Sequence, residues 1–330
     1  MKKKIKVCII GGCQLGMMLA QASSKLNITP LIYSNTKDSP AAKVAKVYYG
    51  DFDDVERIKK FIKQVDLVTY EFENIPAKSL KLIEQLVPIS PPVNSLKITQ
   101  DRVKEKKFFN DNKIPCAKTL ILKNDIDLKV IKKKVSYPAI IKTSRLGYDG
   151  KGQFTINNHS DLLKSWTILK KTNCVIEEKI NIKKEISILG ARSPDGEIKI
   201  FPSFRNIHKN HILDITRLPS RTDKQTEELA VEYTIKILKK LKYIGIICIE
   251  FFIDASGNLM ANEMAPRVHN SGHITIEACK TSQFEQHLRA ITNQPLGKVD
   301  IIKPAVMKNL IGDDITCLLY TSDAADDRGC

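Results

Sequence analysis

The sequence predicts a two-part fold, in which an α/β, Rossmann-like domain is followed by an α+β part. Strands and helices alternate up to about residue 98, which is typical of a parallel sheet covered by helices on both faces. From about Gln100 the strands are short and are joined by turns such as "SPDG", which is typical of antiparallel hairpins. A length of 330 residues is enough for about two domains of ordinary size.

The N-terminal elements follow from their apolar patterns. The strand "IKVCII" leads into a helix whose apolar residues Leu15, Leu19 and Leu26 share one face. Further strands are expected at 30–34 and 65–70, and further helices near Asp53 and Pro76. Beyond Gln100 we expect helices at 101–112 and 224–241 and the strands "YPAIIKT", "CVIEEKI", "EISILGAR", "GIICIEFFI" and "LMANEMA".

Composition indicates an ordinary cytoplasmic globular protein. The chain is 42% hydrophobic and 27% charged, and no apolar run reaches the roughly 18–20 residues of a membrane span. Its eight cysteines are scattered without CxxC or metal-ligand spacing, which favours a reducing compartment and buried free thiols.

The net charge of +16 raises the alternative of a nucleic-acid-binding module. The lysines are spread along the whole chain, however, and there is one tryptophan and no basic stripe interleaved with aromatics. We therefore favour an anionic small molecule as the partner, with no nucleic acid and no membrane.

The glycine turn "GGCQLG", residues 11–16, resembles a dinucleotide-binding fingerprint but lacks two of its features. The middle position, where glycine lets the backbone approach a pyrophosphate, is Cys13. The second strand ends in Ser34 and Asn35, where an acidic residue would bind the ribose hydroxyls. The turn therefore predicts no NAD.

A second glycine-rich stretch, "GYDGKGQF" from Gly147 to Phe154, has backbone amides that can wrap phosphate oxygens, with Lys151 adding charge. Its spacing is not that of a P-loop, and a plain hairpin turn is the alternative. Upstream, Lys142 lies within the apolar strand "AIIKT". Such a lysine either meets an anion such as ATP phosphate or belongs to an edge strand.

Two carboxylates are expected to converge on the hairpin around "DASGN". If the turn is 254–258, Glu250 falls opposite Asn262 and within one residue of Glu263. Opposed carboxylates need a positive group between them, and Mg²⁺ prefers such oxygen ligands. The alternative is that one glutamate pairs with a lysine on a solvated face.

The segment "APRVHNSGH" follows these carboxylates directly. Its Arg267, His269 and Ser271 can hold a small oxyanion, whereas His273 by itself fits a structural role. The later stretch "SQFEQHLRAI" has the pattern of a capping box, with Ser282 as N-cap and Glu285 three residues on, and is interpreted as structural.

These motifs occur in an order that resembles one enzyme family, the N5-carboxyaminoimidazole ribonucleotide synthases, which are ATP-grasp ligases of purine biosynthesis. The resemblance runs from about Lys4 to Asp314 through "GGCQLG", "YEFENIP", "QDR", "GYDGKGQ", "EEKI", "NIH", "EFF", "NEMAPRVHNSGH" and "TSQFEQHLRAI". "YEFENIP" distinguishes it from the related formate-dependent glycinamide ribonucleotide transformylase. The resemblance implies a pre-ATP-grasp domain (1–98), an ATP-grasp domain (99–298, with a lid at about 118–182) and the start of a C-terminal domain (299–330).

The resemblance also implies a role for each site residue. ATP would contact Arg102, Lys142, Gly147, Tyr148, Asp149, Gly150, Lys151, Gly152, Glu177, Glu178, Lys179, Ile180, Glu185, His208, Asn262 and Glu263. Glu250 and Glu263 would hold two Mg²⁺ ions, and Arg267 and His269 would hold bicarbonate or carboxyphosphate. Gln14, Leu15, Glu73 and Tyr148 would touch 5-aminoimidazole ribonucleotide, with Asp149 as proton acceptor.

The implied reaction is ATP- and bicarbonate-dependent carboxylation of that ribonucleotide through carboxyphosphate, by a cytoplasmic homodimer that uses neither NAD nor biotin. The alternatives are another ATP-grasp ligase, such as the transformylase, and, more remotely, a nicotinamide-dependent dehydrogenase. The tail "ITCLLYTSDAADDRGC" from about residue 315 has no family character. Our hypothesis is that it is foreign or misread sequence joined to a truncated gene; resequencing that returned the same tail in an intact gene would refute it.

Overall fold

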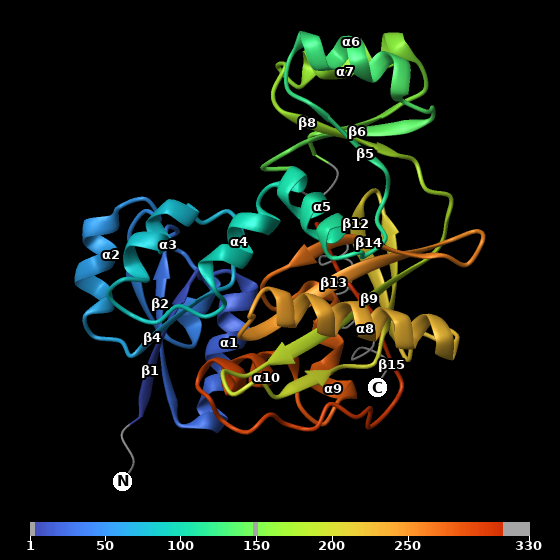
Figure 1. Ribbon diagram of the computed structural model, residues 1–330. Helices are drawn as coiled ribbons and strands as arrows, with labels where there is room; N and C mark the ends of the chain where they lie inside the picture. Colours follow the sequence, from blue (N-terminus) through green and yellow to red (C-terminus); the bar gives the residue numbers. More distant parts are fainter. Residues whose placement is uncertain (1–3, 148–150, 313–330) are drawn as a thin grey trace, which may run out of the picture.

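The computed structural model describes residues 4–147 and 151–312, so the tail from about 315 lies outside it. These residues form three sheets, each with its own helices (Figure 1). The first sheet and its helices lie at the left of the figure, the large second sheet lies beside them, and the third sheet stands apart at the top.

The first sheet is parallel and has the order β3-β2-β1-β4, as the alternating pattern predicts. Its strands and helices are β1 (Ile5–Ile10), α1 (Gln14–Ser23), η1 (Ser24–Leu26), β2 (Ile28–Ser34), η2 (Pro40–Lys43), β3 (Lys46–Tyr49), α2 (Val55–Ile62), β4 (Leu67–Tyr70), α3 (Ala77–Ile83) and α4 (Val93–Thr99).

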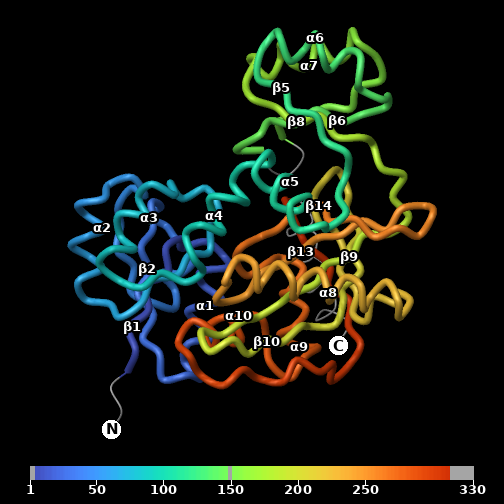
Figure 2. The backbone as a smooth tube through the Cα atoms, in the orientation of Figure 1, coloured from blue at the N-terminus to red at the C-terminus, as the bar shows by residue number. Residues whose placement is uncertain are grey.

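The two faces of this sheet enter two different hydrophobic cores because successive side chains of a strand point to opposite sides. Cys8 and Ile10 pack with residues of α2 and α3. Val7 and Ile9 pack with Leu19 of α1 in a core that continues into the second sheet. In both figures α1 lies beside α10 (Gln283–Ile291), which covers the second sheet (Figure 2).

The second sheet is antiparallel along its order β14-β13-β9-β11-β12-β15, and β10 adds to β9. The hairpin predicted at "SPDG" is confirmed as the β9–β10 pair. The elements of this region are α5 (Arg102–Asp111), β9 (Ile182–Arg192), β10 (Ile198–Ile200), β11 (Phe204–Lys209), β12 (Ile212–Leu218), α8 (Lys224–Lys240), β13 (Gly245–Asp254), β14 (Leu259–Ala265), η3 (Asn270–Ile274), α9 (Thr275–Ala278), α10 and β15 (Ala305–Lys308).

The third sheet, with the order β5-β8-β6-β7, is covered by two helices on one face (Figure 1). Its elements are β5 (Thr119–Leu122), α6 (Asp125–Lys134), β6 (Ala139–Thr143), β7 (Gln153–Ile156), α7 (His159–Ile168) and β8 (Cys174–Glu178). It has a hydrophobic core of its own around Trp166. This unit occupies the span in which a lid is expected.

The expected strands and helices named above are confirmed, apart from shifts of a few residues at their ends. The structure adds β3, α4, β5, α6, β7, α7, β11, β12, α9 and β15, which the pattern does not predict. Of the cysteines within the described ranges, Cys8, Cys174, Cys248 and Cys279 are buried free thiols, whereas Cys13 is exposed. Within the same ranges, no helix combines the length and the apolar character that crossing a membrane requires.

Candidate active site

The glycine turn between β1 and α1 encloses a buried carboxylate of the chain itself. Glu71 follows β4, and its Oε1 accepts the backbone N–H of Cys13 at 3.0 Å. A Cβ added to Gly11 would lie 2.5 Å from that oxygen, so the close approach requires glycine. The amide of Cys13 thus binds a carboxyl oxygen of the chain itself, in the place where a dinucleotide phosphate would bind in the fingerprint.

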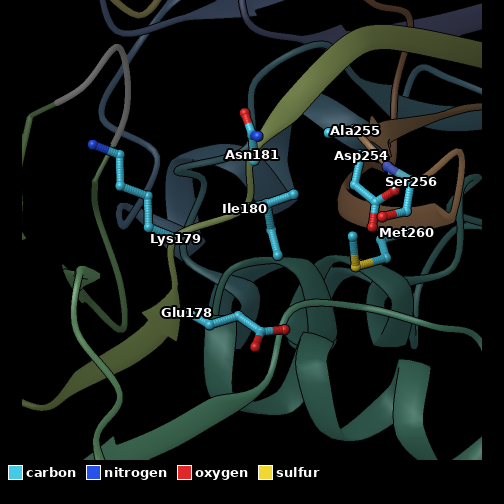
Figure 3. Close-up of a pocket in the computed structure, with 8 residues that line it drawn as sticks. All are labelled: Glu178, Lys179, Ile180, Asn181, Asp254, Ala255, Ser256 and Met260. Atoms are coloured by element: carbon cyan, nitrogen blue, oxygen red, sulfur yellow. Dashed lines mark hydrogen bonds between the residues drawn. The ribbon is translucent and has the colours of Figure 1, made fainter.

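A pocket of about 360 Å³ lies between the end of β8 and the β13–β14 turn. Its lining residues are Glu178, Lys179, Ile180, Asn181, Asp254, Ala255, Ser256 and Met260. Ile180 lies in the middle of the group, and Met260 lies at the right beside Asp254 and Ser256 (Figure 3). The two segments are joined where the Ala255 N–H donates to the Asn181 carbonyl at 2.9 Å. Three of the predicted nucleotide residues, Glu178, Lys179 and Ile180, therefore line one pocket, with apolar side chains against which a flat base can pack.

The two predicted metal carboxylates face each other directly on β13 and β14. Glu250 pairs with Glu263, and Phe251 pairs with Ala261, so a β-bulge leaves Asn262 as the extra residue. The expectation that Glu250 lies opposite Asn262 is therefore wrong by one residue. The uniform two-residue alternation assumed from the turn does not hold across a bulge.

The surroundings of this pair fit a divalent cation. Burial, followed by the neighbouring Glu263, raises the pKa of Glu250 to about 8, and the Asn262 side chain hydrogen-bonds to it. Opposed carboxylates repel each other, and the three side chains together offer hard oxygen donors. These oxygen donors are of the kind that Mg²⁺ prefers, and the magnesium site itself stays a prediction.

Arg267 lies in the loop after β14, where it joins the second sheet to the first domain. Its guanidinium forms an ion pair with Glu73 at 2.8 Å and donates to the Val268 carbonyl at 2.9 Å. The structure therefore brings together a predicted oxyanion residue and a predicted ribonucleotide residue. Glu73 is partly exposed, so it remains accessible to a ligand.

His269 is held in one tautomer. The backbone N–H of Ser271 donates to its Nδ1 at 3.3 Å, and because an amide N–H can only donate, the ring proton is on Nε2. Nε2 faces Glu250 Oε1 at 3.4 Å. Burial lowers the pKa of His269 well below its ordinary value, so the ring is neutral. His269 can therefore donate a hydrogen bond through Nε2 while remaining uncharged.

Lys142 meets an anion within the protein, as one of the two interpretations of its strand requires. Its Nζ donates to Glu177 Oε2 at 2.6 Å, and Lys106 of α5 lies 3.3 Å from the other oxygen. Burial alone would raise the pKa of Glu177, but the two lysines outweigh it and lower the pKa to about 2. Glu177 therefore points into a buried ion cluster, whereas the next three residues line the pocket.

Arg102, the first residue of α5, forms hydrogen bonds with the N-terminal end of the glycine-rich stretch. It donates to the Thr143 carbonyl at 3.1 Å and to the Gly147 carbonyl at 3.0 Å. At the other end, the Gly152 carbonyl accepts the Thr143 N–H, and Gly152 has a φ of +72°. The predicted residues Tyr148, Asp149 and Gly150 lie outside the described residues, and Lys151 is exposed.

The remaining predicted residues divide into two groups. Glu185 and His208 form an ion pair on neighbouring strands of the second sheet, and that contact raises the pKa of His208 although burial acts in the opposite direction. Gln14 is exposed at the start of α1, whereas the partly buried Leu15 side chain packs against the core.

Sequence reasoning missed Glu105 and Lys106, two charged residues that are almost fully buried. Glu105 accepts the Met264 N–H at 2.7 Å, and Lys106 donates to the Asn262 carbonyl at 2.7 Å, so they hold both sides of Glu263. Helical spacing places both on the face of the fully buried Phe109. That spacing could have indicated that both residues are buried, but the many charged residues of the helix made it look solvent-exposed.

Together, the pocket, the carboxylate pair and the two-domain fold define the ATP-grasp class of ATP-dependent ligases. The ATP-grasp domain model matches residues 107–284, and the ribonucleotide synthetase preATP-grasp domain model matches residues 3–100. Within this class, the chain belongs to the N5-carboxyaminoimidazole ribonucleotide synthases.

Several relatives carry that assignment. The chain is 39% identical to the N5-carboxyaminoimidazole ribonucleotide synthase of Bacillus subtilis over 93% of this chain and 81% of that protein. It is 38% identical to that of Pseudomonas aeruginosa over 93% and 85% of the two chains. The solved Staphylococcus aureus N5-carboxyaminoimidazole synthetase complexed with ADP matches with a TM-score of 0.93 and 37% identity, over 98% and 87%. The Aspergillus clavatus synthase, solved with ADP and 5-aminoimidazole ribonucleotide, matches with a TM-score of 0.88 and 28% identity, over 94% and 83%.

Proposed function

We propose that the chain carboxylates the exocyclic amine of 5-aminoimidazole ribonucleotide, using ATP and bicarbonate. The observation that supports this most is that the nucleotide-sized pocket and the carboxylate pair lie on one hairpin, β13–β14, with Arg267 and His269 directly after it. This arrangement can place a nucleotide phosphate chain beside an oxyanion site. Membership in the synthase family supplies the chemistry of the substrates.

In this proposal ATP lies with its base in the pocket beside Ile180 and Met260 and with its phosphates toward Lys142 and the glycine-rich stretch. Glu185 and His208 lie near the ribose. Arg102 and the Gly147 carbonyl that it holds fix one end of the phosphate-covering loop. Lys151 and the predicted residues 148–150 would complete that loop.

The phosphoryl transfer needs a site that tolerates charge. Glu250, Glu263 and Asn262 would hold Mg²⁺, which when bound offsets the negative charge of the transferring phosphoryl group. Arg267 and the Nε2–H of His269 would orient bicarbonate so that one of its oxygens attacks the γ-phosphorus. The bond from that phosphorus to the bridging oxygen breaks, and ADP and carboxyphosphate are formed. Because His269 donates through Nε2 and is neutral, it positions the oxyanion and takes no proton there.

The carboxylation would follow in the same enclosed site. Carboxyphosphate decomposes to CO₂ and phosphate, and the amine nitrogen forms a bond to the CO₂ carbon and loses a proton, for which Asp149 is the candidate acceptor. A second pocket, of about 210 Å³, lies next to Glu73 and is lined by Asn74, Ile75, Pro76, Gln100, Arg145 and Leu146. It supports placing the ribonucleotide between the first domain and the glycine-rich stretch.

The test is ADP release by the purified chain with Mg-ATP and bicarbonate, with and without 5-aminoimidazole ribonucleotide. We expect the ribonucleotide to stimulate ADP release in a bicarbonate-dependent manner. Glycinamide ribonucleotide with formate serves as the control for the related transformylase reaction. Stimulation by that pair instead, or ADP release indifferent to both amines, would contradict the proposal.

A further inference from the structure

Lys106 lies at the junction of the third sheet and the carboxylate pair. It is 4% exposed, and its Nζ reaches the Asn262 carbonyl of β14 at 2.7 Å and Glu177 Oε1 of β8 at 3.3 Å. One ammonium group therefore contacts both the strand that carries Glu263 and the strand that leads into the nucleotide pocket. Within the described residues, the hydrogen bonds and ion pairs of the Lys106 ammonium involve two residues of the predicted site, Glu177 and Asn262.

The charges of this cluster do not cancel. Glu177 has one negative charge and lies between the ammonium groups of Lys106 and Lys142, so these three ion-paired groups, which form the cluster, have a net charge of +1. Without Lys106, Glu177 and Lys142 would form a neutral pair at 2.6 Å. In a buried, low-dielectric setting such a pair is strong, and Lys142 would have little attraction left for an added anion.

We propose that Lys106 is a positioning residue for the nucleotide: it neutralises Glu177 so that Lys142 can interact with ATP phosphate. The Asn262 carbonyl fixes the Lys106 ammonium in place, because a donor held by two acceptors has little freedom to turn toward the nucleotide itself. Lys106 thus acts through Glu177 and Lys142 and makes no contact with the substrate. This inference rests on the proposed function only in taking Lys142 as a phosphate ligand.

The test compares the dissociation constant of Mg-ADP, measured by isothermal titration calorimetry, for four proteins. They are the wild type, Lys106→Met, Lys106→Met with Glu177→Gln, and the control Lys107→Met. Lys107 is the next residue of α5, is 72% exposed and pairs with Asp111 on the surface. We expect Lys106→Met to weaken Mg-ADP binding by about tenfold, because the net charge of the cluster falls to zero. The double variant restores a net charge of +1 and should bind Mg-ADP more tightly than Lys106→Met does, whereas the control should bind within about threefold of the wild type.

Recovery of affinity in the double variant would support charge balance, because a purely structural role for Lys106 predicts no recovery. If Lys106→Met binds as the wild type does, or if the double variant stays as weak as the single one, the inference is wrong. Should Lys106→Met not fold, Lys106→Gln takes its place, because its amide keeps a hydrogen-bond donor beside the Asn262 carbonyl while removing the charge. A wild type that binds Mg-ADP normally but fails the carboxylation assay would contradict the proposed function and leave this inference supported. A wild type that binds no nucleotide would overturn both.

Discussion

His287 is fully buried on α10 and connects the two main sheets through both ring nitrogens. Its Nδ1 accepts the Ile246 N–H at 3.1 Å, so the proton is on Nε2, which lies 2.8 Å from Thr69 Oγ1 of β4. Burial lowers the pKa of His287 to about 3. The folded protein therefore keeps this ring neutral at pH values where the unfolded chain protonates it.

This difference predicts an acid-dependent loss of stability. The contribution of His287 is fully present above the unfolded pKa of about 6.5 and falls as the pH drops from there toward 3, because only the unfolded state binds the proton. Between pH 7 and pH 5 we expect it to remove about 2 kcal/mol from the free energy of unfolding. Urea unfolding of the wild type and His287→Gln at both pH values measures it. Equal pH dependence in the two proteins would contradict the prediction.

At the same scale, the sequence indicated candidate side chains for chemistry but did not indicate their partners. Glu250, Glu263, Arg267 and His269 were singled out because unusual residue types stood in apolar or clustered settings. Their partners, such as Glu71 beneath the glycine turn, come from segments far apart in the chain. No local pattern reveals such a pairing, because it depends on which strands become neighbours.

Two buried glutamines of α10 hold backbone segments in the same way but in different places. Gln283 accepts the His269 N–H at 2.8 Å and donates to the His269 carbonyl at 2.6 Å. Gln286 accepts the Gly297 N–H at 2.8 Å and donates to the Gly297 carbonyl at 3.0 Å. A single helix therefore fixes both the candidate oxyanion loop and a distant loop, which supplies a matched comparison.

We expect Gln283→Met and Gln286→Met each to lower the free energy of unfolding by about 2 kcal/mol, because each leaves a backbone N–H and C=O without partners. Only Gln283→Met should also lower the turnover number, by about tenfold, because it releases the backbone that aims His269. Unfolding by urea and steady-state carboxylation rates measure the two effects. Similar turnover losses in both variants would mean that α10 affects activity only through stability.

At the level of elements, a strong apolar periodicity was sufficient to predict a strand or a helix. Places where the periodicity is interrupted could not be predicted. The buried strands β1, β4, β6 and β13 and the long helix α8 have clear apolar patterns, and each was predicted. The bulge at Asn262 shifted the register by one residue because an extra residue in one strand changes no local propensity. Strands β11 and β12 were missed because charged residues alternate through them, as in "FRNIHK".

On the scale of the whole molecule, the first domain and the second sheet share one core. Val7, Ile9 and Leu19 belong to the same buried cluster as Ile246, Phe284 and Leu288. The change of sequence pattern near residue 98 therefore does not mark the edge of a hydrophobic core. The alternating pattern could locate the parallel sheet, but not the element that covers its second face, because that element lies almost two hundred residues further on.

This sharing predicts that residues 1–98 do not form a stable domain by themselves. The isolated fragment should bind a hydrophobic dye and unfold without a sharp transition, because the face that carries Val7 and Ile9 lacks its cover. The complete chain under the same conditions is the control. Circular dichroism and dye fluorescence during urea titration measure both. A cooperative transition with no dye binding in the fragment would contradict the prediction.

The packing of α1 against α10 also determines when the first domain can complete its hydrophobic core during translation. The first strand leaves the ribosome early, whereas residues 283–291 follow after most of the chain has been translated. At roughly 5–20 residues per second, the delay is on the order of tens of seconds. During that interval one face of the earliest sheet has no cover, so the nascent chain exposes an apolar surface that the finished enzyme buries.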